Sequence, residues 1–286
     1  SMPRNADEPI AFAEGVFLLS PDASRHLRRN VMLTVLWAVL ISFATAAAIY
    51  PIVMGLTGRL VSMADNLLQA NIETAGVLGG AIAKRDSDTS DHNFRVTIIA
   101  VRIAEALGLD ADAVRNLMKG AFVHDVGKIA IADAILLKPG KLTDEEYEVM
   151  KTHVDEGVAI VAQSHWLSEA ADVVRCHHEK YDGSGYSQGL KGEEIPLSAR
   201  IFAVADVFDA LASRRPYQEP MEFAQAMAVL EEGRGTHFDP TILDAFGGIA
   251  DEIHDSLVAN PEAPARELLG QLLQRYMADA TPELAI

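Results

Sequence analysis

Histidine and aspartate residues recur inside apolar segments of this chain. His124 and Asp125 follow the sequence Ala-Phe-Val, and Asp206 follows Ile-Phe-Ala-Val-Ala. A polar group inside an apolar helix face costs several kcal/mol unless it is paired or binds a metal. A single histidine of this kind is best explained as a hydrogen-bonded core residue, but that explanation does not extend to a set spread over separate segments. The set comprises His92, His124, Asp125, His153, His177, His178 and Asp206.

Imidazole and carboxylate ligands without a thiolate favour iron, manganese or catalytic zinc over a structural zinc site. An aspartate directly after a histidine, such as Asp125, can bridge two ions with its two oxygens, so the set is large enough for a pair of metals. Two ions about 3.5–4 Å apart can stabilise both the attacking and the leaving oxygen of a phosphodiester. The adjacent His177 and His178 would point about 100° apart on a helix, and at a helix end they can serve one such centre from two directions.

Composition limits the kinds of partner. The 286-residue chain carries a formal net charge of -17, which argues against a broad basic surface for nucleic acid. An anionic substrate would therefore need a local cluster of cations, supplied by metal ions or by a few Lys and Arg residues. The single cysteine, Cys176, excludes an intramolecular disulfide and a thiolate-rich zinc site, which suits a reducing compartment.

The elements that must position these residues are helices. From residue 86 the chain shows no run of alternating β-branched residues. Thr143 and Glu146 form a capping-box pattern ahead of a helix over 144–161, and Asp239-Pro240 opens another helix. Gly233 and Gly235 suit the end of a helix that starts near Pro220. The sequence therefore predicts an all-α bundle.

Residues 31–58 contain no Asp, Glu, Lys, Arg or His. About 20 apolar residues suffice to cross a hydrocarbon layer of roughly 30 Å, so this segment predicts a transmembrane helix after a tail over 1–30. The alternative is a buried core helix. Pro51 is expected to kink or finish the span.

The charges around this segment conflict with a cytoplasmic catalytic domain. A basic cluster precedes the span, and the positive-inside rule places that end in the cytoplasm. A single crossing would then export everything after Arg59. The cluster comprises Arg25, His26, Arg28 and Arg29.

Residues 59–85 lack proline and carry apolar residues mostly three to six positions apart. One interpretation is a signalling helix that pairs with its copy in a homodimer. The other is a helix packed on its own domain, since Gly76, Gly79 and Gly80 interrupt the stripe. The apolar positions are Leu60, Met63, Leu67, Ile72, Leu78 and Ile82.

An ordered series of motifs over residues 84–250 resembles the HD-GYP family, a branch of the HD-domain metal phosphohydrolases. The series runs from RDSDTSDHNFRV through HDVGKIAI, LLKPGKLTDEEYEVMKTH, HHEKYDGSGYSQGLKGEEIPLSARI and ADVFDALASRRPY to GTHFDPTILDAF. The resemblance implies an all-α HD-domain bundle with its HD-GYP extension over 86–255. A C-terminal helical extension over 256–286 would follow it.

The resemblance also implies a ligand set. His92, His124, Asp125 and Asp206 would bind one metal, and Asp125 would bridge to a second. His153, His177 and His178 would complete that second site. Asp88 and Asp209 match the glutamates that hold a third ion in some family members, but the shorter Asp side chains favour two metals, Fe or Mn, over three.

Substrate contacts are implied in the same way. Lys128 matches a lysine that contacts the scissile phosphate and helps to protonate the leaving group, and Arg215 matches a phosphate-binding arginine. The family's Gly-Tyr-Pro loop reads Gly185-Tyr186-Ser187 here. Tyr186 can still stack on a guanine or line the pocket, so the change bears on substrate fit or on a diguanylate cyclase partner that reads this loop.

The expected activity is metal-dependent hydrolysis of cyclic di-GMP to linear 5'-pGpG, and more slowly to GMP, by a chain anchored in a bacterial inner membrane with a cytoplasmic catalytic domain. One alternative is a catalytically idle receptor for a cyclic dinucleotide. Another is a phosphodiesterase for a different cyclic dinucleotide, such as cyclic GMP-AMP. The filled ligand positions argue against the receptor, whereas the sequence does not separate the two substrates.

Overall fold

The computed structural model of the chain describes residues 20–85, 90–214, 219–259 and 264–277. Within these ranges the chain forms helices and short turns and no β-strand. The predicted all-α class is therefore confirmed. The chain divides into two compact units, residues 1–62 and residues 63–286.

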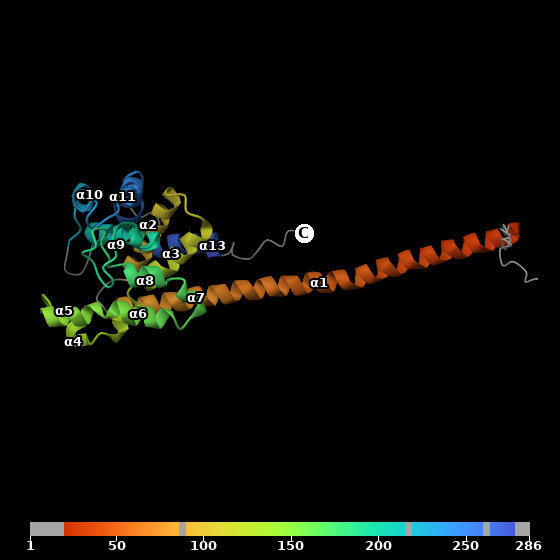
Figure 1. Cartoon of the computed structure of the whole chain (residues 1–286), viewed down its shortest axis with the longest axis horizontal. Helices are drawn as coiled ribbons and strands as arrows, with labels where there is room; N and C mark the ends of the chain where they lie inside the picture. Colours follow the sequence, from red (N-terminus) through yellow and green to blue (C-terminus); the bar gives the residue numbers. More distant parts are fainter. Residues whose placement is uncertain (1–19, 86–89, 215–218, 260–263, 278–286) are drawn as a thin grey trace, which may run out of the picture. The chain divides into compact units, whose positions relative to one another are not determined.

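The helices follow one another along the chain with short connections (Figure 1). The α-helices are α1 (Pro21–Arg85), α2 (Ser90–Ala106), α3 (Ala111–Val123), α4 (Asp133–Leu136), α5 (Asp144–Lys151), α6 (His153–Val161), α7 (His165–Ser168), α8 (Ala171–Cys176), α9 (Leu197–Ala212), α10 (Phe223–Glu232), α11 (Pro240–Gly247), α12 (Ala250–His254) and α13 (Ala265–Met277). Three short helical turns accompany them, namely η1 (Val126–Ala130), η2 (Gly192–Glu194) and η3 (Asp255–Ala259).

The first unit contains the part of α1 that holds the uncharged segment. Its large apolar side chains are exposed, for example Trp37 at 62% and Phe43 at 72%. The described part of the chain has one helix long and apolar enough to cross a membrane, and it is this one. The helix does not end at Pro51 but runs through it.

Helices α2 and α9 form the centre of the second unit. Each contains a stretch of consecutively buried residues, 98–101 in α2 and 201–205 in α9. Four or five consecutive buried residues cover more than a full helical turn, so these stretches lie inside the core. Helices α3, α10, α11 and α13 pack around this pair. Polar residues on α2 or α9 are therefore held in a rigid, water-poor setting.

Residues 63–85 of α1 present two different faces. One face packs on the helical domain, where Ala75 and Ile82 are buried beside Val123 and Val126. The opposite face stays exposed, with Val77 at 74%. The interpretation that this helix packs on its own domain therefore holds for one face.

The C-terminal end of α1 is bound to the turn η1. The guanidinium of Arg85 donates hydrogen bonds to the carbonyl oxygens of Lys128 (3.2 Å), Ile129 (2.6 Å) and Ile131 (2.7 Å). It also forms an ion pair with Asp133 at 2.8 Å. One side chain thus supplies donors to three carbonyls at the end of the short turn, of which that of Lys128 also accepts from the amide of Ile131.

The predicted helix over 144–161 is interrupted. Thr143 and Glu146 form the predicted capping box, and α5 starts there, but it ends at Lys151 and α6 begins at His153. At the break the Thr152 hydroxyl donates to the Val149 carbonyl at 2.7 Å. Asp239 caps α11 as predicted. Helix α10 begins at Phe223, after the expected start near Pro220, and ends at Glu232, with Gly233 as its C-cap.

Candidate metal centre

The seven residues predicted as metal ligands lie in two groups whose ligand atoms are close enough to share an ion. In each group the candidate ligand atoms lie within 4.8 Å of one another. One group comprises His92, His124 and Asp206, and the other comprises Asp125, His153, His177 and His178. Asp125 thus falls with the three histidines, and His124 directly before it falls with the first group.

Most of these ligands lie at helix ends, where consecutive residues need not diverge as they do inside a helix. Helix α8 ends at Cys176, so His177 and His178 follow its last turn. Their ring centroids lie 4.1 Å apart, and both rings face His153, at 5.5 and 5.2 Å. This is how the adjacent histidines serve one site from two directions.

Asp125 lies between the two groups. One of its oxygens, Oδ2, is 3.1 Å from Nε2 of His124 and 2.8 Å from Nζ of Lys128. The other oxygen, Oδ1, is 3.5 Å from Nε2 of His153 and 3.7 Å from Nε2 of His177. Each carboxylate oxygen therefore faces a different group.

Backbone carbonyls fix the orientation of three of the imidazole rings. Nδ1 of His124 lies 2.8 Å from the carbonyl of Ala121, and Nδ1 of His153 lies 2.7 Å from that of Met150. Nδ1 of His177 makes the same kind of contact at 2.9 Å, to Val174. A proton on Nδ1 leaves Nε2 as the lone-pair nitrogen, which is the form a metal requires.

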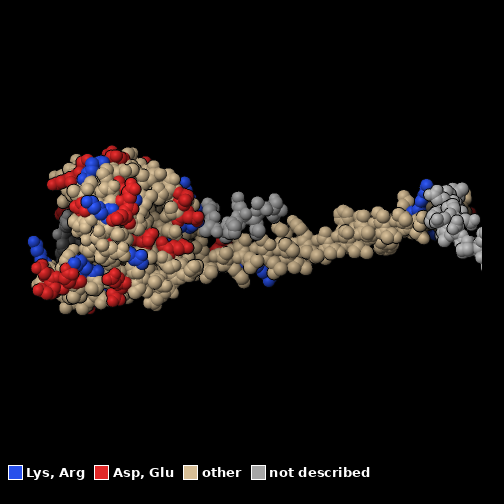
Figure 2. All heavy atoms as spheres, viewed as in Figure 1, with Lys and Arg blue, Asp and Glu red and all other residues tan. Residues whose placement is uncertain are grey.

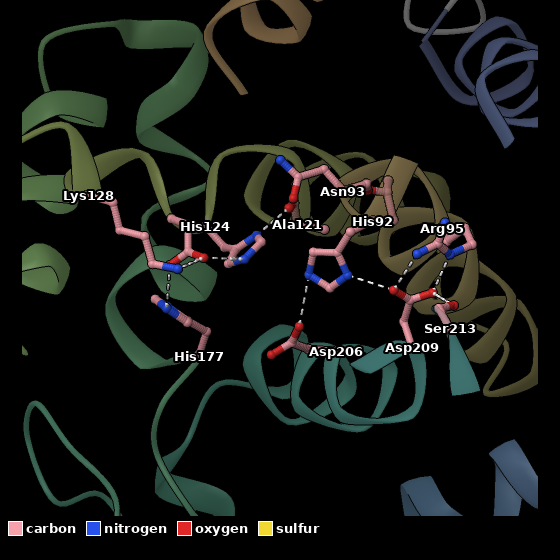
Figure 3. A network of polar contacts seen from close by, with 12 residues as sticks. His92, Asn93, Arg95, Ala121, His124, Lys128, His177, Asp206, Asp209 and Ser213 are labelled. Carbon is pink, nitrogen blue, oxygen red and sulfur yellow. Dashed lines mark hydrogen bonds and ion pairs between the residues drawn. The ribbon is translucent and has the colours of Figure 1, made fainter. Parts of the chain in front are cut away.

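His92 is oriented by a carboxylate instead. Asp209 accepts from Nδ1 of His92 at 2.6 Å, while Nε2 on the other side of the ring faces Asp206 at 3.3 Å (Figure 3). Arg95 and Ser213 also bond the buried Asp209 carboxylate, at 2.5 and 2.9 Å for the shortest contacts. Asp209 stands outside both ligand groups in this arrangement and bonds Nδ1 of His92, and its role at a third ion stays a prediction. Asp88, the other residue predicted for a third ion, lies outside the described residues.

Replacing Asp209 with asparagine is expected to lower metal affinity and turnover by about 10- to 100-fold, the usual effect of losing an outer partner of a ligating histidine. The amide keeps the shape but removes the charge that Arg95 and His92 share. Metal content and turnover of the purified chain would be measured beside Asp244→Asn, an exposed residue of α11. Unchanged values in Asp209→Asn would contradict the orienting role.

Electrostatics in the first group favour a bound cation. Although burial alone lowers the pKa of His92, hydrogen bonds with Asp206 and Asp209 raise it to about 10. Burial also lowers the pKa of His124, but the negative charge of Asp125 raises it by more, so the net shift is upward. Without a metal the charge of these ionised carboxylates is therefore balanced by protonated His92 and His124, and a divalent ion that binds here must displace the protons from the two rings.

The second group is kept ready for a metal by burial. Burial lowers the pKa of His153 to about 4, and burial with the neighbouring His177 holds the pKa of His178 well below its ordinary value. Burial alone would raise the pKa of Asp125, but Lys128 and His124 hold it well below the usual range. At neutral pH this group therefore places the neutral imidazoles of His153 and His178 beside the ionised carboxylate of Asp125.

The residues present fit a metal in a further respect. Oδ1 of Asp125 is buried and has no hydrogen-bond partner among the described residues. Leaving a charged oxygen buried without a partner is costly, and cation coordination is the usual way to satisfy it. The donor set of imidazole nitrogens and carboxylate oxygens suits iron, manganese or zinc.

The backbones of η1 and α6 touch directly behind the site. A Cβ atom added to Gly127 would overlap the carbonyl oxygen of His153 and the amide nitrogen of Gly157. Only glycine at position 127 lets the two segments come this close. The contact sets the distance between Asp125, two residues before Gly127, and His153.

A cleft of about 380 Å³ opens onto both ligand groups. His177, His178 and Asp206 contribute to its floor. Tyr186 lines it as predicted, with its ring stacked on His178 at a centroid distance of 4.6 Å. Arg215, predicted to bind phosphate, lies outside the described residues. Among the lining residues that sequence reasoning missed are Tyr147, Lys180 and His237.

The loop that carries Tyr186 is held by buried polar contacts. Oε1 of Glu179 accepts hydrogen bonds from the amides of Gln188 (2.6 Å) and Gly189 (3.0 Å). Gly185 lies against the backbone of residues 178–180, where a Cβ atom would overlap main-chain atoms. The position of Tyr186 is thereby fixed without the proline that Ser187 replaces.

Comparison with known proteins identifies the family. The HD-domain model matches residues 76–242. A cyclic di-GMP phosphodiesterase response regulator of Xanthomonas campestris is 42% identical over 84% of this chain and 64% of its own length. A cyclic di-GMP phosphodiesterase of Thermotoga maritima is 44% identical over 60% of this chain and 47% of its own length.

Two further similar proteins are named for a different substrate, cyclic GMP-AMP. A 3'3'-cGAMP-specific phosphodiesterase of Vibrio cholerae is 39% identical over 68% of this chain and 38% of its own length. The crystal structure of a cyclic GMP-AMP-specific phosphodiesterase from V. cholerae has a TM-score of 0.52 and 18% identity, covering 71% of this chain and 53% of that one. The structural likeness supports the fold alone.

The chain spans between about two fifths and two thirds of the length of these curated relatives. The shared part includes the region that holds both ligand groups, since the family match covers residues 76–242. By this match, by its motifs and by its relatives, the chain belongs to the HD-domain family and to its HD-GYP branch.

Proposed function

We propose that this chain is a metal-dependent phosphodiesterase that hydrolyses cyclic di-GMP to linear 5'-pGpG, and more slowly to GMP. The observation that carries the proposal is the position of Asp125, whose two oxygens face two separate ligand groups at the floor of a cleft. A cleft of about 380 Å³ falls within the usual size range of small-molecule sites.

Two divalent ions held by these groups would supply Lewis-acid activation of water and of the phosphodiester. The protein's own groups complete the chemistry. Lys128, whose ammonium lies 2.8 Å from Asp125, offsets charge on the scissile phosphate and donates a proton toward the leaving ribose oxygen. Tyr186 and His178 form an aromatic wall against which a guanine can stack.

We assign the ions as iron or manganese. The two groups together offer five imidazoles and two carboxylates and no thiolate. This mixture suits Fe and Mn, although zinc shares much of the same preference. Metal identity is checked by elemental analysis of protein purified without added metal and without oxygen.

The proposal predicts anaerobic turnover of cyclic di-GMP by the full chain in detergent after reconstitution with Fe(II) or Mn(II). Products would be separated by chromatography, and a chelator should block the appearance of 5'-pGpG. Metal-loaded protein that binds cyclic di-GMP without forming product would contradict the enzyme and favour the receptor interpretation.

Cyclic GMP-AMP is a second candidate substrate, because relatives with 39% and 37% identity carry that name. The two dinucleotides differ in one base, so the discriminating contacts must involve base edges rather than phosphates. Turnover of both compounds, compared as kcat/KM, separates the two assignments.

We further propose that α1 anchors the chain in a bacterial inner membrane with the catalytic domain in the cytoplasm. The exposed apolar side chains over residues 31–58 support the anchor. Because the basic cluster before the span argues for the opposite orientation, protease protection in membrane vesicles is the deciding test.

Self-association and loop recognition complete the proposal. The exposed face of α1, with Met63, Leu67 and Val77, supports a homodimer in which this face pairs with its copy. The substitution Leu67→Glu, which places a charge on this face, should then dissociate the dimer in analytical ultracentrifugation. The exposed Ser187 loop supports docking of a diguanylate cyclase at Gly185-Tyr186-Ser187, and substitution of Ser187 by proline should change that binding without changing metal content.

A further inference from the structure

One wall of the cleft is built from two loops that lie far apart in the sequence. The amide of Tyr181 donates to the carbonyl of His237 at 3.2 Å, and the amide of Asp182 donates to that of Thr236 at 2.8 Å. These bonds tie the segment that follows the ligands His177 and His178 to the loop that precedes α11. His237, one of the tied residues, and Lys180, which directly precedes Tyr181, line the same cleft.

The cation on this wall is Lys180, and its charge, after the hydrogen bonds from Ser184, helps to lower the pKa of Asp182. Within the described part of the chain Lys180 forms no ion pair, and the nearby Asp182 accepts instead from the amide of Ser184 at 2.8 Å. The half-buried Lys180 ammonium is thus left facing a cleft. The chain is otherwise acidic, and Figure 2 shows Asp and Glu side chains spread over the visible face of the helical domain. A lysine placed in this way favours an anionic ligand.

His237 is suited to act with Lys180. Its ring stacks on the buried Phe238 at a centroid distance of 4.2 Å and an angle of 14°, which fixes its plane. Burial and the charge of Lys180 lower the pKa of His237, so the ring is neutral at pH 7 and carries one N–H donor. An ammonium and a neutral N–H donor on one wall form a pair of hydrogen-bond donors for phosphate oxygens.

A cyclic dinucleotide carries two phosphates on opposite sides of its ring. The ligand groups and Lys128 serve one phosphate, and the other must lie elsewhere in the same cleft. We propose that Lys180, together with His237, binds the second phosphate, which is not cleaved while the first lies over the metal groups. This inference rests on the proposed function and names a specificity determinant of that site.

The test compares two substrates with the metal-loaded full chain. Cyclic di-GMP has two phosphates, whereas bis(4-nitrophenyl) phosphate has only the one that is cleaved. Lys180→Ala is expected to raise KM for cyclic di-GMP by about 10- to 100-fold, the effect of losing a charge-assisted hydrogen bond, with kcat changed far less. Turnover of bis(4-nitrophenyl) phosphate should stay at the level of the unaltered protein.

Two further variants sharpen the comparison. Lys180→Arg keeps the charge and should retain most of the affinity for cyclic di-GMP. Lys141→Ala removes the same charge from an exposed position outside the cleft and should leave both substrates unaffected. Equal losses with both substrates in Lys180→Ala, or no loss with either, would overturn the inference.

Calorimetric binding of cyclic di-GMP separates this inference from the proposed function. If the unaltered protein binds cyclic di-GMP and cleaves only bis(4-nitrophenyl) phosphate, the phosphodiesterase proposal fails. A weaker binding constant in Lys180→Ala would still support the second-phosphate site, and an unchanged one would overturn it. Absence of binding by the unaltered protein would overturn both.

Discussion

Asparagine in place of Asp125 is expected to empty the metal centre and to reduce turnover by about a hundred- to a thousandfold, the cost of removing one preorganised electrostatic group. The substitution replaces one of two carboxylate oxygens by an amide nitrogen, which donates and cannot ligate. Because Oδ1 faces His153 and His177 while Oδ2 faces His124, either orientation of the amide spoils one ligand group. Metal content by elemental analysis and turnover of cyclic di-GMP would be measured on the same samples.

The matched control is Asp155→Asn, an exposed residue in the first turn of α6, two positions after His153. It makes the same change of charge near the same helix end and should leave both measurements unchanged. An Asp125→Asn protein that retains its full metal content and its turnover would contradict the shared-ligand assignment.

Alanine at position 127 is expected to disrupt the site by backbone displacement. The added methyl group would overlap main-chain atoms of His153 and Gly157, and neither can move as a flexible side chain does. Overpacking of this kind costs about 1–3 kcal/mol or more. We expect an unfolding free energy lower by at least that amount in urea, together with loss of metal, since His153 moves away from Asp125.

Gly270→Ala provides the control within α13. Nothing lies within 4 Å of the Cβ position at Gly270, so alanine there should stabilise the helix by about 0.5–1 kcal/mol. The two variants make the same chemical change with opposite expected signs. Equal unfolding midpoints for Gly127→Ala and the unaltered chain would refute the close approach of η1 and α6.

Some candidate ligands could be predicted from the sequence because they interrupt an apolar segment, whereas His92, His177 and His178 stand beside polar residues and depended on the motif series. His124 and Asp206 are recognisable without a structure, since a core helix has no other use for an unpaired polar residue. Lys180 and His237 gave no such signal, because polar residues in loops are common. Their shared wall arises from backbone hydrogen bonds between loops remote in sequence, which no local pattern encodes.

Element boundaries were less predictable for a related reason. The predicted helix over 144–161 contains no proline, and its only glycine, Gly157, lies inside α6, so nothing in its composition marks the break at Thr152. The charge pattern divides residues 31–58 from 59–85, yet α1 continues through Arg59 because arginine is a good helix former. The role of Asp209 was equally hidden, since only packing brings Arg95 from α2 beside it.

The hydrogen bonds of Arg85 connect the end of α1 mechanically to the turn η1, which carries Lys128. Its guanidinium holds the carbonyls of Lys128 and of Ile129 and Ile131 just beyond it, so a rotation of this end of α1 pulls on the backbone that carries Lys128. Thermodynamic linkage runs both ways, so a ligand that fixes the Lys128 turn must also restrict the rotational freedom of α1. Ligand binding in the cleft would therefore change the mobility of α1, and a rotation of α1 would in turn change the affinity of the cleft for its ligand.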